Sequence, residues 1–393
     1  MTSADAPHPV WGRGFRPFFL MGSLYGAFAA ITWTAMWQGL VPAPAWLAPM
    51  WWHGHEMLFG FTVAAIAGFL TTAAPVWTGR PAPTGLPLMA LVALWVVGRL
   101  AMFAAGVLPA WLVAVLDGAF LPVLAFVLAG LVRRTGQYRN HGVIVLVGVL
   151  AVANLAVHAQ AVGVATFSAP LALRFAADVV IVLVVVIGGR ITPAFTANAF
   201  LRSGIAAPIR SWRWLDRGAV AATVLVAVVD LVAPRTAASG VVAGAAAVAV
   251  AARLAGWQSL RTWRDPLVWS LHAGMAWVPL GFALVAASDL GAAIPATAGL
   301  HALTSGAMGA MIAAVVTRVS LGHTGRVLAL PRGAALSYVL VHAGALARVA
   351  AALVPSAPGL LWMGALLWAA AFALFAVLYA PILLRPRVDG KPG

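Results

Sequence analysis

The sequence predicts an all-α protein, a polytopic transmembrane bundle of about twelve helices with both termini in the cytoplasm. Two features of its composition lead to this class: 63% of the 393 residues are hydrophobic, and only 8% are charged. Because a soluble domain averages about 25% charged residues, this chain has too little polar surface to fold in water. The third observation is the placement of the arginines, most of which lie between long apolar segments.

Twelve apolar segments, most of them separated by Pro or Gly, approach the roughly 20 residues that a membrane crossing takes. We therefore expect a single transmembrane domain over 1–393, and the sequence gives no convincing internal repeat. The two segments within 217–256 are short and rich in Ala and Val. The predicted helices cover 17–39, 51–76, 86–106, 109–133, 142–162, 171–190, 217–233, 237–256, 267–288, 296–318, 332–354 and 359–384.

The basic residues predict the orientation of the bundle. Twenty of the 24 fall on the side that holds the N-terminus, every second loop and the C-terminus, with three arginines in 133–139 alone. By the positive-inside rule this side is cytoplasmic. The exceptions are Arg174 and Arg235 at helix ends, and Arg99 and Arg348 within segments. The N-terminus lacks the short apolar region and cleavage site of a signal peptide, so the first segment is expected to remain as an anchor.

Composition and motifs exclude several classes of function. The chain has no cysteine, which rules out disulfides, thiolate metal sites, Cys-ligated iron–sulfur clusters and covalent c-type haem. The net charge of +15 does not indicate nucleic-acid binding, because the arginines do not form one basic face. We find no phosphate-binding loop, no G-x-S-x-G motif and no H-E-x-x-H motif. Any metal must therefore be bound by His, Met, carboxylate or backbone oxygen.

The segment over 51–76, WWHGHEMLFGFTVAAIAGFLTTAAPV, carries three ionisable residues in its first turns: His53, His55 and Glu56. Burying such groups in hydrocarbon costs several kcal/mol each unless they find partners. His53 and His55 point about 200° apart on a regular helix, so the two cannot reach one ion from it. Glu56 shares a face with His53 at i+3, where it would orient that ring or deliver protons. The alternative is that all three cap a helix at the membrane surface.

Other intramembrane polar residues have both structural and functional interpretations. His301, on a predicted face with Ser305 near the outer surface, is either a ligand or a hydrogen-bonded structural residue, and the same holds for His272. His158 shares a face with Asn154, which favours a structural hydrogen bond between them.

Four charged residues also lie within the segments: the acids Asp117 and Asp178 and the bases Arg99 and Arg348. They would either pair with one another or, in the case of the arginines, bind the propionates of a porphyrin.

Several stretches of the chain resemble the NnrS family. They are GFRPFFL at 14–20, WHGHEMLFGF at 52–61, AGFLTTAAPVWTG at 67–79, GGRITPAFTANA at 188–199, LHAGMAWVPLG at 271–281, HALTSGAMGAM at 301–311, TRVSLGHTGR at 317–326 and PRVDGKPG at 386–393. The resemblance implies a bacterial inner-membrane protein that contains haem and copper and acts in nitric oxide metabolism and nitrosative-stress defence. It also implies the candidate metal ligands His53, His55, His272, His301 and His323.

We therefore expect non-covalent haem b, and copper with it, in the outer half of the membrane. The ligands would be His53, His55 and His301, Glu56 would handle protons, and Arg99 and Arg348 would bind propionates. The reaction would be nitric oxide reduction or scavenging. A nitric oxide reductase-like activity would need an electron donor that the sequence does not identify. Two alternatives stay open: a transporter, suggested by Pro-broken helices, and a non-catalytic haem-based sensor of nitric oxide that acts through the arginine-rich loop at 190–217.

Overall fold

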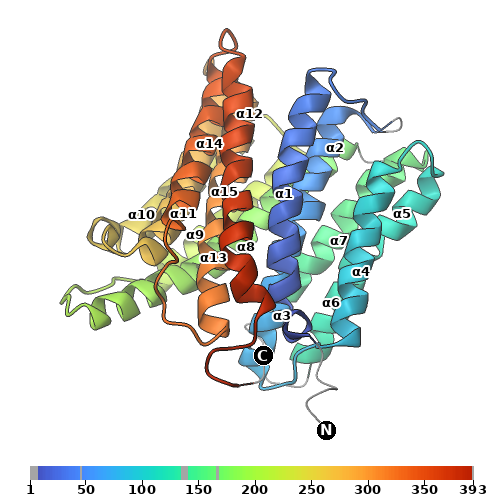
Figure 1. The fold of residues 1–393 in the computed structure, drawn as a ribbon. Helices are drawn as coiled ribbons and strands as arrows, with labels where there is room; N and C mark the ends of the chain where they lie inside the picture. Colours follow the sequence, from blue (N-terminus) through green and yellow to red (C-terminus); the bar gives the residue numbers. More distant parts are fainter. Residues whose placement is uncertain (1–7, 45–46, 134–139, 165–167, 392–393) are drawn as a thin grey trace. The chain divides into compact units, whose positions relative to one another are not determined.

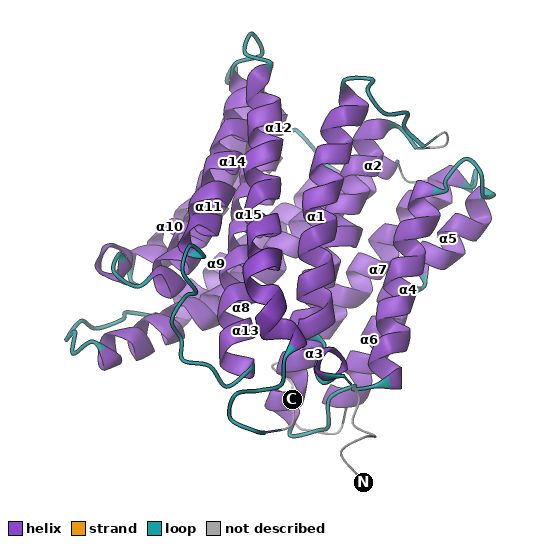
Figure 2. Cartoon of the chain, viewed as in Figure 1, coloured by secondary structure: helices purple, strands orange, loops and turns teal. Residues whose placement is uncertain are grey.

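The computed structural model describes all residues except 1–7, 45–46, 134–139, 165–167 and 392–393. Every regular element of the described chain is a helix, which confirms the predicted fold class (Figure 2). Arg134 and Arg139, two residues of the predicted cytoplasmic set, lie outside the described residues.

The chain packs as two compact units. The first unit comprises Met1–Ala176, Val316–Ala329 and Phe372–Gly393, and the second comprises Ala177–Val315 and Leu330–Ala371. Helices α8, α13 and α15 contribute to both units (Figure 1). The helices are α1 (Phe15–Trp37), α2 (Pro49–His55), the π-helical segment η2 (Glu56–Thr62), α3 (Val63–Thr78), α4 (Leu86–Phe103), α5 (Ala110–Gly118), α6 (Phe120–Val132), α7 (His141–Ala161), α8 (Ala169–Arg202), α9 (Arg213–Val232), α10 (Ala237–Ala255), α11 (Pro266–Asp289), α12 (Ala296–His301), the π-helical segment η5 (Ala302–Met308), α13 (Gly309–His323), α14 (Ala335–Leu353) and α15 (Gly359–Leu384).

Eleven helices of the described chain, some built from consecutive elements, are long and apolar enough to cross a membrane. They correspond to eleven of the twelve predicted segments. The remaining segment, predicted over 217–233, does form a helix, α9. This helix carries too many charged residues to be counted among the apolar spans: Arg213, Asp216, Arg217 and Asp230.

A contact between the two ends of the chain constrains the number of crossings. Arg16, in the first turn of α1, donates through Nη1 to the carbonyl oxygens of Leu383 and Arg385 at the end of α15, both at 2.7 Å. The start of the first span and the end of the last therefore lie at the same membrane surface (Figure 1). A chain that leaves the membrane on the side where it entered crosses an even number of times. We infer that α9 supplies a twelfth crossing.

Topology labelling tests this inference, because the native chain has no cysteine to give background. Ala206→Cys and Ala237→Cys place single thiols on exposed residues that precede and follow α9. In sealed inverted vesicles, a membrane-impermeant maleimide is expected to label the first variant and leave the second unlabelled until detergent is added. Equal labelling of both thiols in intact vesicles would mean that α9 does not cross.

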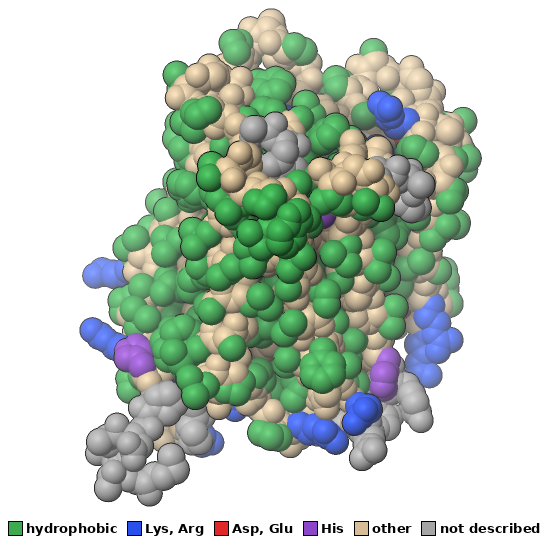
Figure 3. All heavy atoms as spheres, turned by 90° about the vertical axis from the view of Figure 1, so that its right-hand side faces the viewer, with side chains coloured by type: hydrophobic (Ala, Val, Ile, Leu, Met, Phe, Trp, Pro, Cys, Tyr) green, Lys and Arg blue, Asp and Glu red, His purple; other side chains and the backbone are tan. Residues whose placement is uncertain are grey.

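The surface of α4 to α7 has the distribution of side chains expected in a bilayer. Figure 3 shows hydrophobic side chains over the middle of this face, whereas most Lys and Arg side chains lie toward one end. No acidic side chain is visible among the described residues of this face. The pattern agrees with helices that contact lipid along their length and water or headgroups at their ends.

The structure reveals an internal repeat that the sequence alone did not. Each copy is a helix that ends at a histidine, a seven-residue π-helical segment and a longer α-helix: α2, η2 and α3 in one copy, and α12, η5 and α13 in the other. His55 and His301 are 246 residues apart, and so are the first residues of η2 and η5. Both copies end in Thr-Gly-Arg, at 78–80 and at 324–326, with the glycine in the left-handed conformation at φ 68° and 73°.

The two π-helical segments are supported in the same manner. A tryptophan indole N–H donates to a backbone carbonyl of each segment, from Trp95 to Gly60 at 3.1 Å and from Trp368 to Ser305 at 3.3 Å. Glycine occupies the same position of both, Gly60 and Gly306, where a Cβ would lie within 2.5 Å of a neighbouring aromatic ring. Because π-helical turns often occur at functional sites, these segments direct attention to the histidine before each.

Candidate functional site

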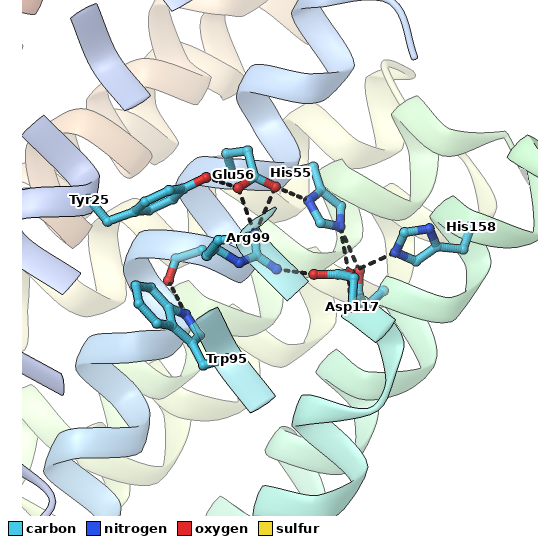
Figure 4. Close-up of polar contacts among 9 residues, drawn as sticks. Tyr25, His55, Glu56, Trp95, Arg99, Asp117 and His158 are labelled. Carbon is cyan, nitrogen blue, oxygen red and sulfur yellow. Dashed lines mark hydrogen bonds and ion pairs between the residues drawn. The ribbon is translucent and has the colours of Figure 1, made fainter. Parts of the chain in front are cut away.

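A network of buried polar side chains surrounds the first π-helical segment, within the first unit (Figure 4). Its seven members come from five parts of the chain, and six of the seven residues are 5% exposed or less. So many ionisable groups are rarely buried together in a membrane protein unless they have a function. The network consists of Tyr25 of α1, His55 and Glu56 at the junction of α2 and η2, Arg99 of α4, Asp117 of α5, and Asn154 and His158 of α7.

Two glycines allow the helices to approach closely enough for these contacts. A Cβ at Gly98 would lie 3.2 Å from the Cα of Asp117, so glycine there lets α4 pack directly on α5. A Cβ at Gly60 would lie 3.1 Å from Nη1 of Arg99, so glycine leaves room for that guanidinium beside η2. The sequence therefore brings Arg99 within reach of acids on two different helices.

Arg99 bridges the two carboxylates of the network. Its Nη1 donates to both oxygens of Glu56 at 2.7 Å, and its Nη2 donates to Oδ1 of Asp117. Glu56 also accepts a hydrogen bond from the Tyr25 hydroxyl. One guanidinium cannot neutralise two carboxylates, so the network needs a second positive charge to be neutral.

His55 lies between the two carboxylates of the network. Nδ1 lies 2.7 Å from Oε1 of Glu56, and Nε2 lies 2.8 Å from Oδ1 of Asn154 and 3.2 Å from Oδ2 of Asp117. The amide of Asn154 is oriented by its own donation to Asp117, at 2.9 Å, so its oxygen must face His55. Both ring nitrogens of His55 therefore face side-chain oxygens, those of Glu56 at Nδ1 and those of Asn154 and Asp117 at Nε2.

Three members of the network have the chemistry and spacing of a metal site. Nε2 of His158 lies 2.7 Å from Oδ2 of Asp117, and one ligand atom each from His55, Asp117 and His158 lie within 4.8 Å of one another. All three residues are buried. Two imidazoles and one carboxylate form a donor set that suits copper, zinc or non-haem iron.

The structure places the residues predicted at 53–56 in different environments. His55 and Glu56 are in the network, whereas His53 stacks on Trp33 with ring centroids 4.7 Å apart. Glu56 binds the ring of His55 and not that of His53, contrary to the i, i+3 prediction. The reason is local: the α-helix gives way to the π-helix at Glu56, so α-helical angular spacing does not apply.

The predicted residues His272 and His301 belong to the second unit, and their hydrogen bonds distinguish them. Nδ1 of His301 faces the carbonyl of Thr297 at 2.7 Å and must donate to it, so the neutral ring carries its lone pair on Nε2. Both nitrogens of His272 contact hydroxyls, Thr196 at Nε2 and Ser259 at Nδ1, each at 2.8 Å. Binding of a metal by His272 would have to break one of these bonds.

Two further histidines have less suitable surroundings for a metal. Nδ1 of His342 accepts from the indole of Trp277 at 2.9 Å, so the proton of the neutral ring is on Nε2 and the ring has no lone pair to offer. His323, at the end of α13 in the first unit, packs against Phe15 and does not belong to the His55 network. Its role as a ligand stays a prediction.

The two predicted propionate-binding arginines also differ. Arg99 is engaged by Glu56 and Asp117, so a propionate would have to displace one of these acids. Arg348, on α14 of the second unit, has no ion pair with any residue that the structure describes. Of the two, Arg348 is the one with unused capacity for an anion.

Three members of the candidate metal centre and its support were not predicted from the sequence. Asp117 was interpreted only as a partner for an arginine, and Asn154 and His158 as a pair bonded to each other. The structure directs both α7 residues at Asp117. Their spacing of four residues did indicate a shared face, which was the available signal.

Fold and site together define a polytopic membrane protein with a buried histidine–carboxylate centre. The family model for the NnrS protein matches residues 9–387, nearly the whole chain. The chain belongs to the NnrS family, as its motifs predict. A comparison with curated proteins gives no match.

Proposed function

We propose that this chain is a bacterial inner-membrane metalloprotein of nitric oxide metabolism that binds copper at His55, Asp117 and His158. The family name supports the link to nitric oxide. The observation that carries the proposal of a metal is the spacing of the three donor atoms, which lie within 4.8 Å of one another in a fully buried setting. When bound, the metal would supply a coordination site for nitric oxide and a centre for electron transfer.

The donor geometry fits a small ion. Ligand atoms about 2.1 Å from a tetrahedral metal lie about 3.4 Å apart. Oδ2 of Asp117 lies 3.2 Å from Nε2 of His55 and 2.7 Å from Nε2 of His158, so small side-chain movements would complete the site. The Asn154 oxygen, which now contacts His55, would be released by that movement.

Charge balance favours a monovalent ion such as Cu(I). With Arg99 and an imidazolium at His55, the two carboxylates Glu56 and Asp117 would be balanced. A metal that binds Nε2 of His55 displaces one proton, so a monovalent ion leaves the network neutral, whereas a divalent ion adds a buried charge. Net charge is costly within a bilayer. The remaining Nδ1–H of His55 would still donate to Glu56, the carboxylate–histidine–metal arrangement common in metal sites.

The surroundings of His55 do not fit a haem. The ring packs against Phe59 and His158, with centroids 5.0 and 5.4 Å away, and its nitrogens contact side chains on both edges. Neither ring nitrogen of His55 is therefore left to bind the iron of a porphyrin. We therefore propose that His301 would hold haem b, because the lone pair of its neutral ring is on Nε2 and its Nδ1 contact fixes the ring orientation. Arg348 would bind a propionate, since α14 packs against α12.

One preparation tests the proposed function. Protein purified in mild detergent should contain copper and iron by elemental analysis and show a Soret band that shifts when nitric oxide is added anaerobically. A colourless, metal-free protein with an ordered fold would contradict the proposal and favour a transporter. Consumption of nitric oxide with an added electron donor would identify an enzyme, and stoichiometric binding without turnover a sensor or scavenger.

A substitution of His301 separates the two metals. His301→Ala is expected to lower the Soret absorbance per protein at least tenfold, because it removes the axial imidazole, while copper stays bound at the separate His55 centre. His141→Ala, a change of an exposed histidine at the start of α7, is the control. A wild-type Soret band in His301→Ala would refute the assignment of haem to this residue.

A further inference from the structure

Three motifs to which residue chemistry alone assigned no role meet at one end of the first unit. They are FRPFF at the start of α1, HTGR at the end of α13 and PRVDGKPG after α15. The backbone N–H of Val388 donates to the carbonyl of Thr324, and Nη1 of Arg387 donates to the carbonyl of His323 at 2.7 Å. The tail after α15 is therefore attached to the end of α13.

Arg16 lies at the centre of this region and is fully buried. Its Nη1 is used by the carbonyl oxygens of Leu383 and Arg385. Its Nε and Nη2 have no hydrogen-bond partner among the described residues. These two nitrogens form one edge of the guanidinium, with parallel N–H groups that match two oxygens of a single oxyanion. A buried donor pair without a partner is costly, which indicates that an acceptor belongs there.

The charges around Arg16 are positive and nearly uncompensated. Arg326 and Arg387 lie close enough for their charges to act on Arg16, and Arg385 acts on Arg326. Nη1 of Arg326 is also buried without a partner in the described part of the chain.

The nearby acid, Asp389, is already committed. It accepts from Nε and Nη2 of Arg387 at 2.8 and 2.5 Å, and this pairing lowers its pKa to about 2. Its carboxylate is therefore engaged by Arg387 and leaves Arg16 and Arg326 to an external anion.

We propose that Arg16 and Arg326 bind a phosphate-type oxyanion, with the Nε and Nη2 edge of Arg16 holding two of its oxygens. The site lies where α1, α13 and α15 meet the membrane surface, so the anion is either the headgroup of an anionic phospholipid or a free oxyanion such as inorganic phosphate. Binding would lower the repulsion among the arginines and hold the three chain segments together.

The test uses full-length protein and two variants. Arg16→Lys keeps the charge and a donor for the carbonyls of α15 but lacks the two-pronged edge, and Arg326→Gln removes the second cation. Arg80→Gln, at the equivalent position of the other repeat copy, is the matched control. Delipidated proteins are titrated with phosphate at constant ionic strength, and with phosphatidylglycerol or phosphatidylcholine in mixed micelles, and binding is followed by native mass spectrometry and thermal unfolding.

Phosphate or phosphatidylglycerol is expected to bind the wild type and Arg80→Gln, and to bind both test variants at least tenfold more weakly. Binding of phosphate but not of phosphatidylglycerol would identify a free oxyanion as the ligand. Binding of phosphatidylglycerol but not of phosphate would identify a lipid headgroup. Phosphatidylcholine, which has no net charge, should bind all proteins equally. The proposal is overturned if neither anion raises the melting temperature of the wild type, or if Arg16→Lys and Arg326→Gln bind as the wild type does.

Discussion

Arg99→Met is expected to prevent accumulation of correctly folded protein. The change leaves Glu56 and Asp117 facing each other across a buried site with one imidazolium for two carboxylates. Removal of one partner from a buried ion pair costs about 3–5 kcal/mol, against a total stability of about 5–15 kcal/mol for a typical protein. The yield of monodisperse protein after size exclusion, and the melting temperature of what remains, measure the effect.

A second substitution should rescue this variant if the cause is charge. Asp117→Asn in the Arg99→Met background removes the excess negative charge, and the double variant should be more stable than Arg99→Met alone. Arg80→Met is the control, since Arg80 is exposed and its side chain donates to the carbonyl of Gly130. If Arg99→Met behaves like Arg80→Met, the two carboxylates do not depend on Arg99.

His158→Gln is expected to reduce bound copper at least tenfold while haem stays at the wild-type level. Glutamine keeps a polar group beside Asp117 but lacks an imidazole nitrogen, so two of three ligands remain. Loss of supporting residues alone typically weakens metal sites 10- to 100-fold, and loss of a ligand should do no less. Elemental analysis per mole of protein, with the Soret absorbance of the same sample, is the measurement.

The control for this experiment is His342→Gln. His342 is a partly buried histidine, but its Nδ1 accepts from Trp277 and its neutral ring has no lone pair for a metal. If His158→Gln and His342→Gln both keep the copper content of the wild type, the proposed centre at His55, Asp117 and His158 is contradicted.

Most of the fold could be predicted because it follows from composition and segment length. The twelve predicted segments all form helices, and the predicted family is confirmed by the match over residues 9–387. The π-helical segments were not predicted, because a shift to i+5 hydrogen bonding leaves no mark on hydrophobicity. The repeat was missed because its shared residues, such as the histidine and the Thr-Gly-Arg, are sparse and separated by 246 positions.

The site was predicted only in part, for a physical reason. A hydrophobic segment reveals that Arg99 or Asp117 must find a partner, but not which neighbouring helix provides it. Glu56 and Arg99 are 43 positions apart and His55 and Asn154 are 99 apart, so these contacts depend on packing that spacing does not encode. Whether His53 and His301 act as ligands stays a prediction.

The two copies of the His-π-helix segment differ in electrical character. One copy places a glutamate directly after its histidine, and the other places an alanine there. In the first copy a carboxylate contacts the imidazole directly, whereas in the second the imidazole donates to a backbone carbonyl. The same backbone arrangement thus presents two imidazoles in different electrostatic surroundings within one membrane protein.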